Sequence, residues 1–462
     1  MRLPPVAADQ EGVTTGRHLL AAVSASVALL APAVAQAAPP LDPNFAQQWA
    51  LARESTLGAL TAWQQSTGSG SVVAVLDTGA DMTHPDLEGA LWTNPGEIPG
   101  NGIDDDHDGY VDDVHGADIV NNDGDPTDDE GHGSHVAGIT AARAGNGIGG
   151  AGLAPGAQLM IVKVLDSHRS GTAAGLATGI RYALAHGATI INTSVNGDGT
   201  SKPLQDALRQ ADAAGALVVA SAGNDGRDID QDPSYPASYS DPSIVSVASE
   251  GETGVLSSFS NYGAQSVDIA APGENILSTA YDGDYELRSG TSMAAPFVSA
   301  TLALMHSLQP ELGGPALKAA LLAGATPDAN LGGDVASGSL SASGALRALT
   351  GGPAPTPLSL VVGAADHASR GAVLHWTLGG DSADVASLAV YVDGRRLPTA
   401  GIPDSVRVRA RPGLHRLRVV AYDGEDQPIA LTQADGTFRV RNADWRKVRA
   451  KTRAKHRVAH KR

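Results

Sequence analysis

The sequence predicts an α/β fold with a doubly wound, mostly parallel sheet and helices on both faces, followed by a small all-β sandwich. From residue 71 onward, short and nearly continuous apolar runs alternate with longer helical patterns. Such alternation is typical of a parallel sheet that helices cover on both faces. A segment rich in Pro and Gly, 351–357, then precedes shorter runs in which polar and apolar residues alternate, as in antiparallel strands.

The elements of the α/β region follow from these patterns in chain order. Residues 39–70 are expected to form an arm and a short helix that lead into the first strand, 71–76. Further strands are expected from their apolar, β-branched runs at 158–165, 189–192, 217–220 and 244–248. Amphipathic patterns predict helices at 174–186 and 204–214.

The two ends of the chain differ from its body. Residues 19–31 are apolar, follow Arg17 and precede small-x-small cleavage patterns, so 1–38 is predicted to be a signal peptide of a secreted protein. The apolar run is too short to span a bilayer, and no other segment is expected to cross a membrane. We interpret the rest of the chain as four parts: the α/β domain is residues 39–350, a linker is 351–357, the β-sandwich is 358–441, and a basic disordered tail is 442–462.

Charge is distributed unevenly. The last 22 residues hold ten of the 32 Lys and Arg residues and one of the 50 acidic residues, which leaves a net charge of −27 on the rest of the chain. An acidic body argues against nucleic acid as the main substrate. The basic tail is expected to be a solvated segment, with contact to anionic surfaces as the alternative.

Bound cations are a second expectation. Cysteine is absent, so disulfides cannot staple the fold. Residues 97–130 contain thirteen carboxylates and no Lys or Arg, so this run is either solvated or held by cations. Asp104, Asp106, Asp108 and Gly109 have the opening spacing of an EF-hand loop. The twelfth position is His115 in place of Glu, so we predict a calcium loop that is not an EF-hand.

A serine at the start of a helical pattern is the first candidate for chemistry. Ser292 lies in the segment 289–296, whose small residues run into the apolar stretch 297–308. A helix N-terminus presents unpaired N–H groups and the positive end of its dipole, which suits a nucleophile whose reaction creates an oxyanion. An ordinary N-cap serine has the same local pattern. The serine alone leaves both interpretations open.

Other residues have the types and places that acyl transfer needs. Asp77 follows the strand 71–76, at the edge where open α/β sheets hold their sites. His132 and His135 begin a small-residue helix; no third metal ligand is adjacent, so we expect one catalytic and one structural histidine. Asn224 follows the strand 217–220 and offers a side-chain N–H donor for an oxyanion. For Asp77 and Asn224 a turn role is the alternative.

Three blocks, in the order Asp, His and Ser, resemble the signature blocks of subtilisin-like serine peptidases, the subtilase family. They are residues 75–81, 132–138 and 290–296, and the resemblance covers roughly residues 45–349. It implies a subtilisin-like fold for the α/β domain and serine-type endopeptidase activity on proteins or peptides. It also implies that Ser292 is the nucleophile, His132 the general base, Asp77 the residue that orients the base and Asn224 the oxyanion-hole donor.

The resemblance implies a substrate cleft as well. Its residues would be Gly171, Ser194, Val195, Asn196, Gly197 and Ser234. Asn196 stands where the family usually has Gly, so its side chain is expected to narrow the first specificity pocket. Ser234, at the base of that pocket, favours neutral and apolar substrate side chains.

Structural Ca²⁺ is the cofactor that the resemblance implies. Asp86 and Asn146 match one calcium site of the family, and a second is expected at Asp118, Asn121, Asp123 and Asp125. The loop with Asp104, Asp106 and Asp108 resembles a third site, found in some members. The segment 38–45 leaves no room for the folding prodomain of many secreted members. The chain is therefore expected either to fold without such a prodomain, with or without calcium as an aid, or to be assisted by its C-terminal region.

Two other functions are open at this stage. A calcium-dependent surface-binding protein on an inactive protease scaffold would explain the acidic run and the β-domain, although the four catalytic residues are all present. An esterase of the α/β-hydrolase class would require the order Ser, acid, His and a Gly-x-Ser-x-Gly motif, and both are absent. We therefore expect a secreted serine endopeptidase.

Overall fold

A computed structural model describes residues 40 and 42–351 and, beyond them, the backbone of strands between residues 359 and 440. The predicted signal peptide, all but Gly351 of the predicted linker, and the basic tail lie outside the described residues. Among the residues described, no helix combines the length and apolar character needed to span a bilayer.

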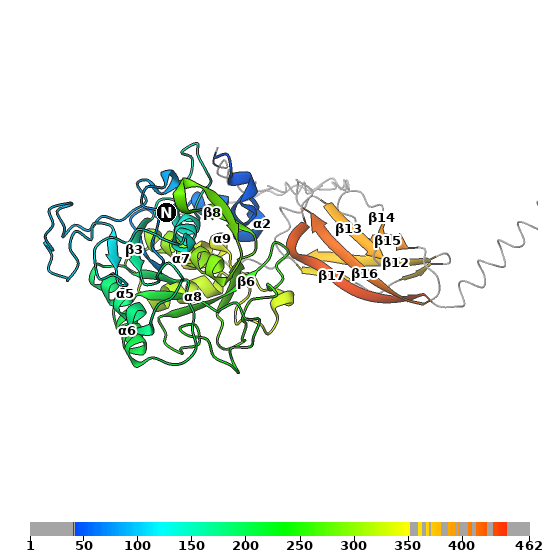
Figure 1. Ribbon diagram of the computed structural model, residues 1–462. Helices are drawn as coiled ribbons and strands as arrows, with labels where there is room; N and C mark the ends of the chain where they lie inside the picture. Colours follow the sequence, from blue (N-terminus) through cyan, green and yellow to red (C-terminus); the bar gives the residue numbers. More distant parts are fainter. Residues whose placement is uncertain are drawn as a thin grey trace, which may run out of the picture. The chain divides into compact units, whose positions relative to one another are not determined.

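A seven-stranded parallel sheet forms the centre of the α/β region, which confirms the predicted fold class for this part of the chain (Figure 1). Neighbouring strands pair in parallel throughout. In spatial order the strands are β2 (Gly116–Asp118), β3 (Gln158–Lys163), β1 (Val72–Asp77), β4 (Ile190–Thr193), β5 (Leu217–Ser221), β6 (Ile244–Glu250) and β7 (Ile269–Pro272).

Each strand buries side chains on both faces of the sheet. On β1, Val73 and Val75 belong to one buried cluster, whereas Ala74 and Leu76 belong to the other. The first cluster is covered by α4 (His132–Ala141), α7 (Thr291–Leu308), α8 (Gly314–Ala323) and α9 (Ala342–Leu349). The second is covered by α5 (Ala173–Ala185) and α6 (Lys202–Ala213), which lie side by side in Figure 1. Burial on both faces explains why the strands are almost continuously apolar.

Two helices of the first layer carry candidate residues at their N-termini. His132 is the first residue of α4, and Ser292 is the second residue of α7, which is fully helical from Thr291. Both helices follow a glycine, Gly131 and Gly290. α4 and α7 pack against each other. The N-termini of these two helices, which are distant in the sequence, therefore lie on the same layer.

Several short elements were not expected from the sequence. They include β2 and β7 at the sheet edges and the antiparallel pair β8 (Ile276–Thr279) and β9 (Tyr285–Arg288). In the N-terminal arm, where one short helix was expected, the structure has η1 (Phe45–Gln47), α1 (Trp49–Ala52), α2 (Glu54–Leu57) and α3 (Ala59–Trp63). β2 is only three residues long and lies within the acidic run, and β7 ends in Pro272. Elements this short have no hydrophobic period of their own, so tertiary pairing decides them.

Eight strands are described in the C-terminal region. They are β10 (Ser359–Val362), β11 (Asp366–Ala368), β12 (Gly371–Gly379), β13 (Ser387–Val392), β14 (Arg395–Leu397), β15 (Ser405–Val408), β16 (Gly413–Tyr422) and β17 (Pro428–Val440). Their pairings are antiparallel and form two sheets of four strands. That the two sheets pack as a sandwich, and where that domain begins and ends, stay predictions from the sequence.

Candidate active site

Asp77 and His132 meet at the carboxyl end of the sheet. Asp77 is the last residue of β1 and is fully buried, and its Oδ1 lies 2.7 Å from His132 Nδ1. The same oxygen accepts the backbone N–H of Thr78 at 2.8 Å. Asp77 Oδ2 is buried and has no hydrogen-bond partner among the described residues. A buried carboxylate in this position fixes the orientation of the imidazole and stabilises its protonated form.

Close backbone packing brings the histidine to the aspartate. A Cβ built on Gly133, the second residue of α4, would lie 2.0 Å from the carbonyl oxygen of Gly79 in the loop after β1. Only glycine permits this approach, because real Cβ atoms do not come so near to backbone oxygen. Gly133 also donates its N–H to Thr78 Oγ1 at 2.9 Å. The sequence pattern of His followed by Gly therefore has a geometric cause.

Asp128 forms hydrogen bonds both to the loop after β1 and to the start of α4. The sequence did not indicate this role. Its carboxylate accepts hydrogen bonds from Thr78 Oγ1 at 2.8 Å and from the N–H and Oγ of Ser134 at 2.9 and 2.6 Å. Burial alone raises the pKa of Asp128, but hydrogen bonds from Gly131, Ser134 and Glu130 outweigh it and hold that pKa below its ordinary value. The carboxylate is therefore ionised beside the active site.

Ser292 lies in the first turn of α7 and is 9 % exposed. Its Oγ donates to the carbonyl oxygen of Ser194 at 3.3 Å, and its own carbonyl accepts from Ser194 Oγ at 2.9 Å. Of the two hydrogen bonds that a triad requires, the described residues show the one between His132 and Asp77, and not one between His132 and Ser292. Catalytic hydrogen bonds of ligand-free sites are often long or misaligned and tighten when substrate binds.

Two hydrogen-bond donors lie at the start of α7. Asn224 Oδ1 accepts from the N–H of Thr291 at 2.8 Å and from Thr291 Oγ1 at 3.1 Å, and the side-chain Nδ2 has no acceptor among the described hydrogen bonds. Met293 donates its N–H to Gly290. Among the first three amides of α7, the described hydrogen bonds leave that of Ser292 without an acceptor. Asn224 Nδ2 and Ser292 N are thus available to an oxyanion formed at Ser292.

The predicted substrate-binding residues fall into two places. Ser194, Val195, Asn196 and Gly197 follow β4, and Gly197 exchanges backbone hydrogen bonds of 2.9 Å with Tyr235, the residue after Ser234. A Cβ built on Gly223 would lie 3.3 Å from both Asn196 Nδ2 and Ser234 Oγ, so both side chains lie beside Gly223, the residue before Asn224. Gly171 instead lines a hollow of about 320 Å³ with Ile119, Val120, Val164, Asp166, Ser170, Thr172 and Gly175.

His135 has the structural environment that was expected for the second histidine. It is fully buried, and its Nε2 lies 3.0 Å from the carbonyl oxygen of Glu286 in β9. Burial lowers the pKa of His135 to about 3, so the ring is neutral at ordinary pH. Neither His132 nor His135 belongs to a group of clustered metal ligands in the part of the chain described.

Asp86 and Asn146, expected to bind calcium, are in direct contact. Asn146 Nδ2 donates to Asp86 Oδ1 at 2.7 Å, and the N–H of Gly150 donates to Asp86 Oδ2 at 3.0 Å. Burial raises the pKa of Asp86. Asp42, which the sequence analysis left within the N-terminal arm, accepts the N–H groups of Gly145 and Gly147 at 2.6 and 2.9 Å in the same loop. Two carboxylates thus converge on one loop.

The second expected calcium set is spread over successive turns. Asp118 accepts from the N–H and Nδ2 of Asn121, both at 2.8 Å. Asp123 accepts the N–H of Asp125 at 3.1 Å, and Asp125 in turn accepts from Thr127. Asp118 and Asp123 exchange backbone hydrogen bonds of 2.8 and 3.1 Å, so the two pairs belong to one turn-rich loop.

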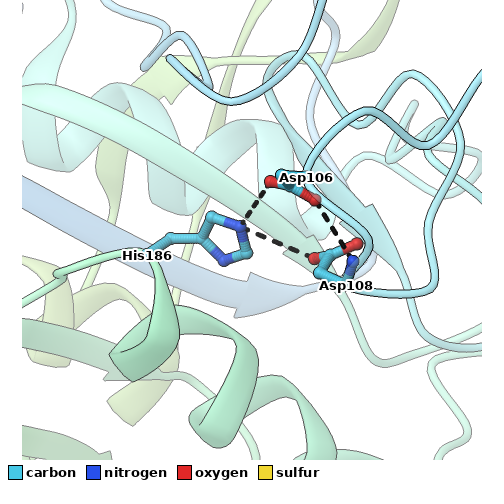
Figure 2. A group of neighbouring side chains, drawn as sticks. All are labelled: Asp106, Asp108 and His186. Atoms are coloured by element: carbon cyan, nitrogen blue, oxygen red, sulfur yellow. Dashed lines mark hydrogen bonds and ion pairs between the residues drawn. The ribbon is translucent and has the colours of Figure 1, made fainter.

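Side chains of the acidic loop belong to two groups whose oxygen or nitrogen atoms lie within 4.8 Å of one another, and both groups contain Asp106. One contains Asp106, Asp108 and His186, and the other Glu97, Asp106 and Asp113. Figure 2 shows His186 pointing between the two aspartates, with its Nε2 3.4 Å from Asp106 and 3.5 Å from Asp108. Asp104 is in neither group and instead accepts the N–H groups of Asp108 and Gly109.

The acidic residues of these groups fit a hard cation. Burial raises the pKa of Asp113 to about 6, although hydrogen bonds from Tyr182 and Asn94 act in the opposite direction. Carboxylates that approach so closely repel one another unless a proton or a cation lies between them, and carboxylate oxygen is the ligand that Ca²⁺ prefers. His186, on the C-terminal end of α5, had no signal in the sequence, because only the fold brings it to this loop.

Comparison with known proteins identifies the family. Residues 68–340 match the model of the subtilase family. Thermitase from Thermoactinomyces vulgaris is 40% identical over 268 residues, which cover 58% of this chain and 85% of thermitase. The major intracellular serine protease of Bacillus subtilis is 41% identical over 247 residues, which cover 53% of this chain and 70% of that protein.

A solved structure agrees with this match. A protease from Pseudoalteromonas arctica superposes with a TM-score of 0.57 at 30% sequence identity, and the alignment covers 68% of this chain and 100% of that one. The esterase interpretation is therefore wrong, because the match is to a different family. The chain belongs to the subtilase family and is a serine endopeptidase.

Proposed function

We propose that this endopeptidase is secreted and calcium-stabilised, and that it cleaves peptide bonds through an acyl-enzyme on Ser292. The observation that carries the catalytic assignment is the 2.7 Å contact between the Asp77 carboxylate and His132 Nδ1 on the layer that also holds Ser292. With Nδ1–H donated to Asp77, the neutral ring presents a lone pair at Nε2, as a general base requires.

The proposed reaction begins with a rotation of the Ser292 side chain away from Ser194 and toward His132. His132 Nε2 then takes the hydroxyl proton while Oγ attacks the substrate carbonyl carbon. Asn224 Nδ2 and Ser292 N donate to the oxyanion that forms. The imidazolium gives its proton to the leaving amine, the C–N bond breaks, and water repeats the sequence on the ester.

Secretion is proposed from the N-terminal sequence. The apolar residues 19–31 and the small residues before Ala38 are typical of a signal peptide. The relatives include a protease whose name describes it as intracellular, so this part of the proposal depends on the sequence of this chain alone.

One labelling experiment tests nucleophile and export separately. The full chain is expressed in a secreting bacterial host, and medium and cells are treated with a phosphonofluoridate that reacts with active serines. We expect the medium to contain a protein that begins near Ala37 or Ala38 and carries one phosphonyl group on Ser292, located by mass spectrometry of peptides. Only an activated serine reacts at an appreciable rate.

The outcomes separate the two parts of the proposal. Labelling at Ser292 of a chain that keeps its N-terminus and stays in the cells would refute secretion and leave the nucleophile intact. A folded protein in the medium that stays unlabelled at Ser292 would refute the catalytic assignment and favour a binding protein on an inactive scaffold.

Calcium stabilisation is proposed from the carboxylates of the acidic run and from Asp42 and Asp86, which contact the loop after α4. The acidic side chains offer oxygen ligands, and carboxylate oxygens of Glu97, Asp106 and Asp113 lie within 4.8 Å of one another. A cation that binds the folded chain and not the unfolded one stabilises it by mass action. A bound Ca²⁺ would supply positive charge here and would take no part in peptide hydrolysis.

Chelation should lower thermal stability. We expect excess EDTA to reduce the Tm by about 5–10 °C, because Ca²⁺ at 100 times its Kd contributes about 2.7 kcal/mol. Differential scanning calorimetry with EDTA and then with added Ca²⁺ measures the loss and its recovery. Asp113→Asn should shrink this difference, and Glu311→Gln, which changes an exposed carboxylate outside the run, should not. Equal Tm values with chelator and with Ca²⁺ would contradict calcium stabilisation.

A further inference from the structure

A buried asparagine forms hydrogen bonds to the loop that carries Asn224. Asn261 is fully buried and follows β6, on a segment distant in sequence from the catalytic blocks. Its Nδ2 donates to the carbonyl oxygen of Ala222 at 2.9 Å. Its Oδ1 accepts the N–H of Asp225 at 3.0 Å and the N–H of Arg227 at 3.1 Å. One side chain therefore contacts the backbone on both sides of Asn224.

The backbone of Asn261 adds to this contact. Its N–H donates to the carbonyl oxygen of Gly223 at 2.9 Å. Gly223 has a φ of +106°, and a Cβ built there would lie 2.4 Å from Asn261 Nδ2. Glycine is thus required both for the left-handed backbone and for the space that the asparagine occupies. The residue before Asn224 is fixed by Asn261 in conformation and in position.

On its other side the loop contacts the nucleophile helix. Gly223 donates its N–H to Thr291 Oγ1 at 3.1 Å, and Asn224 Oδ1 accepts from Thr291 N and Oγ1. Asn224 itself is exposed, so its amide is held by the two hydrogen bonds from Thr291 and by the backbone that carries it. An exposed donor that must be pre-organised for a transition state depends on the backbone that carries it.

We propose that Asn261 is a positioning residue of the oxyanion hole: it fixes residues 222–227 so that Asn224 Nδ2 stays aimed at the carbonyl oxygen of the reacting peptide bond. This inference rests on the proposed role of Asn224. Asn261 touches neither substrate nor reacting atoms, and it acts through the loop alone. Loss of the Asn261 side chain leaves the contact between Asp77 and His132 unchanged, but it makes the position of Asn224 Nδ2 less fixed.

The kinetic signature is a loss of kcat with little change in KM, because an oxyanion forms only after substrate binds. We expect Asn224→Ala to lower kcat for a chromogenic peptide on the order of 10²-fold, as removal of such a donor does in subtilisin. Asn261→Ala should lower kcat by about 10-fold. If both act through one hydrogen bond, the double variant should match Asn224→Ala within about 2-fold.

Two further variants separate positioning from stability. Asn261→Asp keeps the volume and the acceptor of the Asp225 and Arg227 N–H groups but loses the donor to Ala222; it should fold and show an intermediate kcat. Ser243→Ala removes a buried hydroxyl that bonds Leu208 and Asp241, away from the loop. This control should lower the Tm and leave kcat unchanged at temperatures well below the Tm.

The outcomes distinguish failure of this inference from failure of the catalytic assignment. If Asn261→Ala lowers kcat by the same factor with Asn224 present or absent, or if Asn261→Ala and Asn261→Asp keep full kcat, positioning through Asn224 is refuted. If Asn224→Ala itself keeps full kcat, the assigned oxyanion donor is wrong, whatever Asn261 does.

Discussion

Replacing Ser292 with alanine is expected to lower kcat for peptide hydrolysis by about 10⁶-fold, the loss known for the same change in subtilisin. The physical reason is that the other hydroxyl in the first turn of α7, Thr291 Oγ1, is already bonded to Asn224 and Gly223, so it does not take the place of Ser292 Oγ. Among the described residues, Ser292 Oγ makes one hydrogen bond, to the carbonyl oxygen of Ser194 at 3.3 Å, so the variant should keep its Tm within a few degrees.

The measurement is initial-rate hydrolysis of a chromogenic peptide, with unfolding followed by circular dichroism. Ser307→Ala is the matched control: it lies on the same helix and its hydroxyl bonds Ser69, away from the site, so its kcat should equal that of the unchanged protein. A Ser292→Ala protein that is folded and retains even a hundredth of the activity would mean that another residue is the nucleophile.

Asp77→Asn is expected to lower kcat by about 10⁴-fold at neutral pH. The carboxylate accepts from His132 Nδ1 at 2.7 Å, so the neutral ring carries its proton there and keeps Nε2 free. An amide would donate its own N–H to Nδ1 and force the proton onto Nε2. The histidine then cannot accept the serine proton, although it occupies the same place.

A pH–rate profile with NMR of the His132 ring protons tests this explanation. We expect the proton signal to move from Nδ1 to Nε2 in the variant, together with the loss of kcat. Asp268→Asn provides the control: Asp268 pairs with Lys318 and with Ser246 far from the site, and its replacement should lower the Tm but spare kcat. Full activity of Asp77→Asn would show that the aspartate does not govern the tautomer.

For the acidic run, composition predicted the need for neutralising groups but not which side chains come together. Its thirteen carboxylates predicted that cations or water must neutralise the segment, and two ligand groups do form there. The expected trio of Asp104, Asp106 and Asp108 is regrouped, however, because His186 and Glu97 replace Asp104. The spacing of residues within a loop predicts a turn. The make-up of a possible metal-binding group also depends on side chains from other elements of the fold.

Asp128 shows a different limit. In the sequence it is one acidic residue among many, but in the fold it receives hydrogen bonds from both catalytic segments. Its partners Thr78 and Ser134 carry no pattern that distinguishes them from other hydroxyl residues. Hydrogen-bond networks of this kind depend on three-dimensional distance, which no local spacing encodes.

The sequence by itself predicted the layer architecture and pointed to Asp77, His132, Ser292 and Asn224 as candidate catalytic residues, because alternating apolar runs and glycine-flanked polar residues are local features of the chain. Only the tertiary structure decided which residues hold the segments around His132 and Asn224, namely Asp128, which bonds Thr78, Gly131 and Ser134, and Asn261, which bonds the loop that carries Asn224. The reason is that a buried carboxylate or amide is satisfied by whichever N–H and O–H groups the packed backbone brings within about 3 Å.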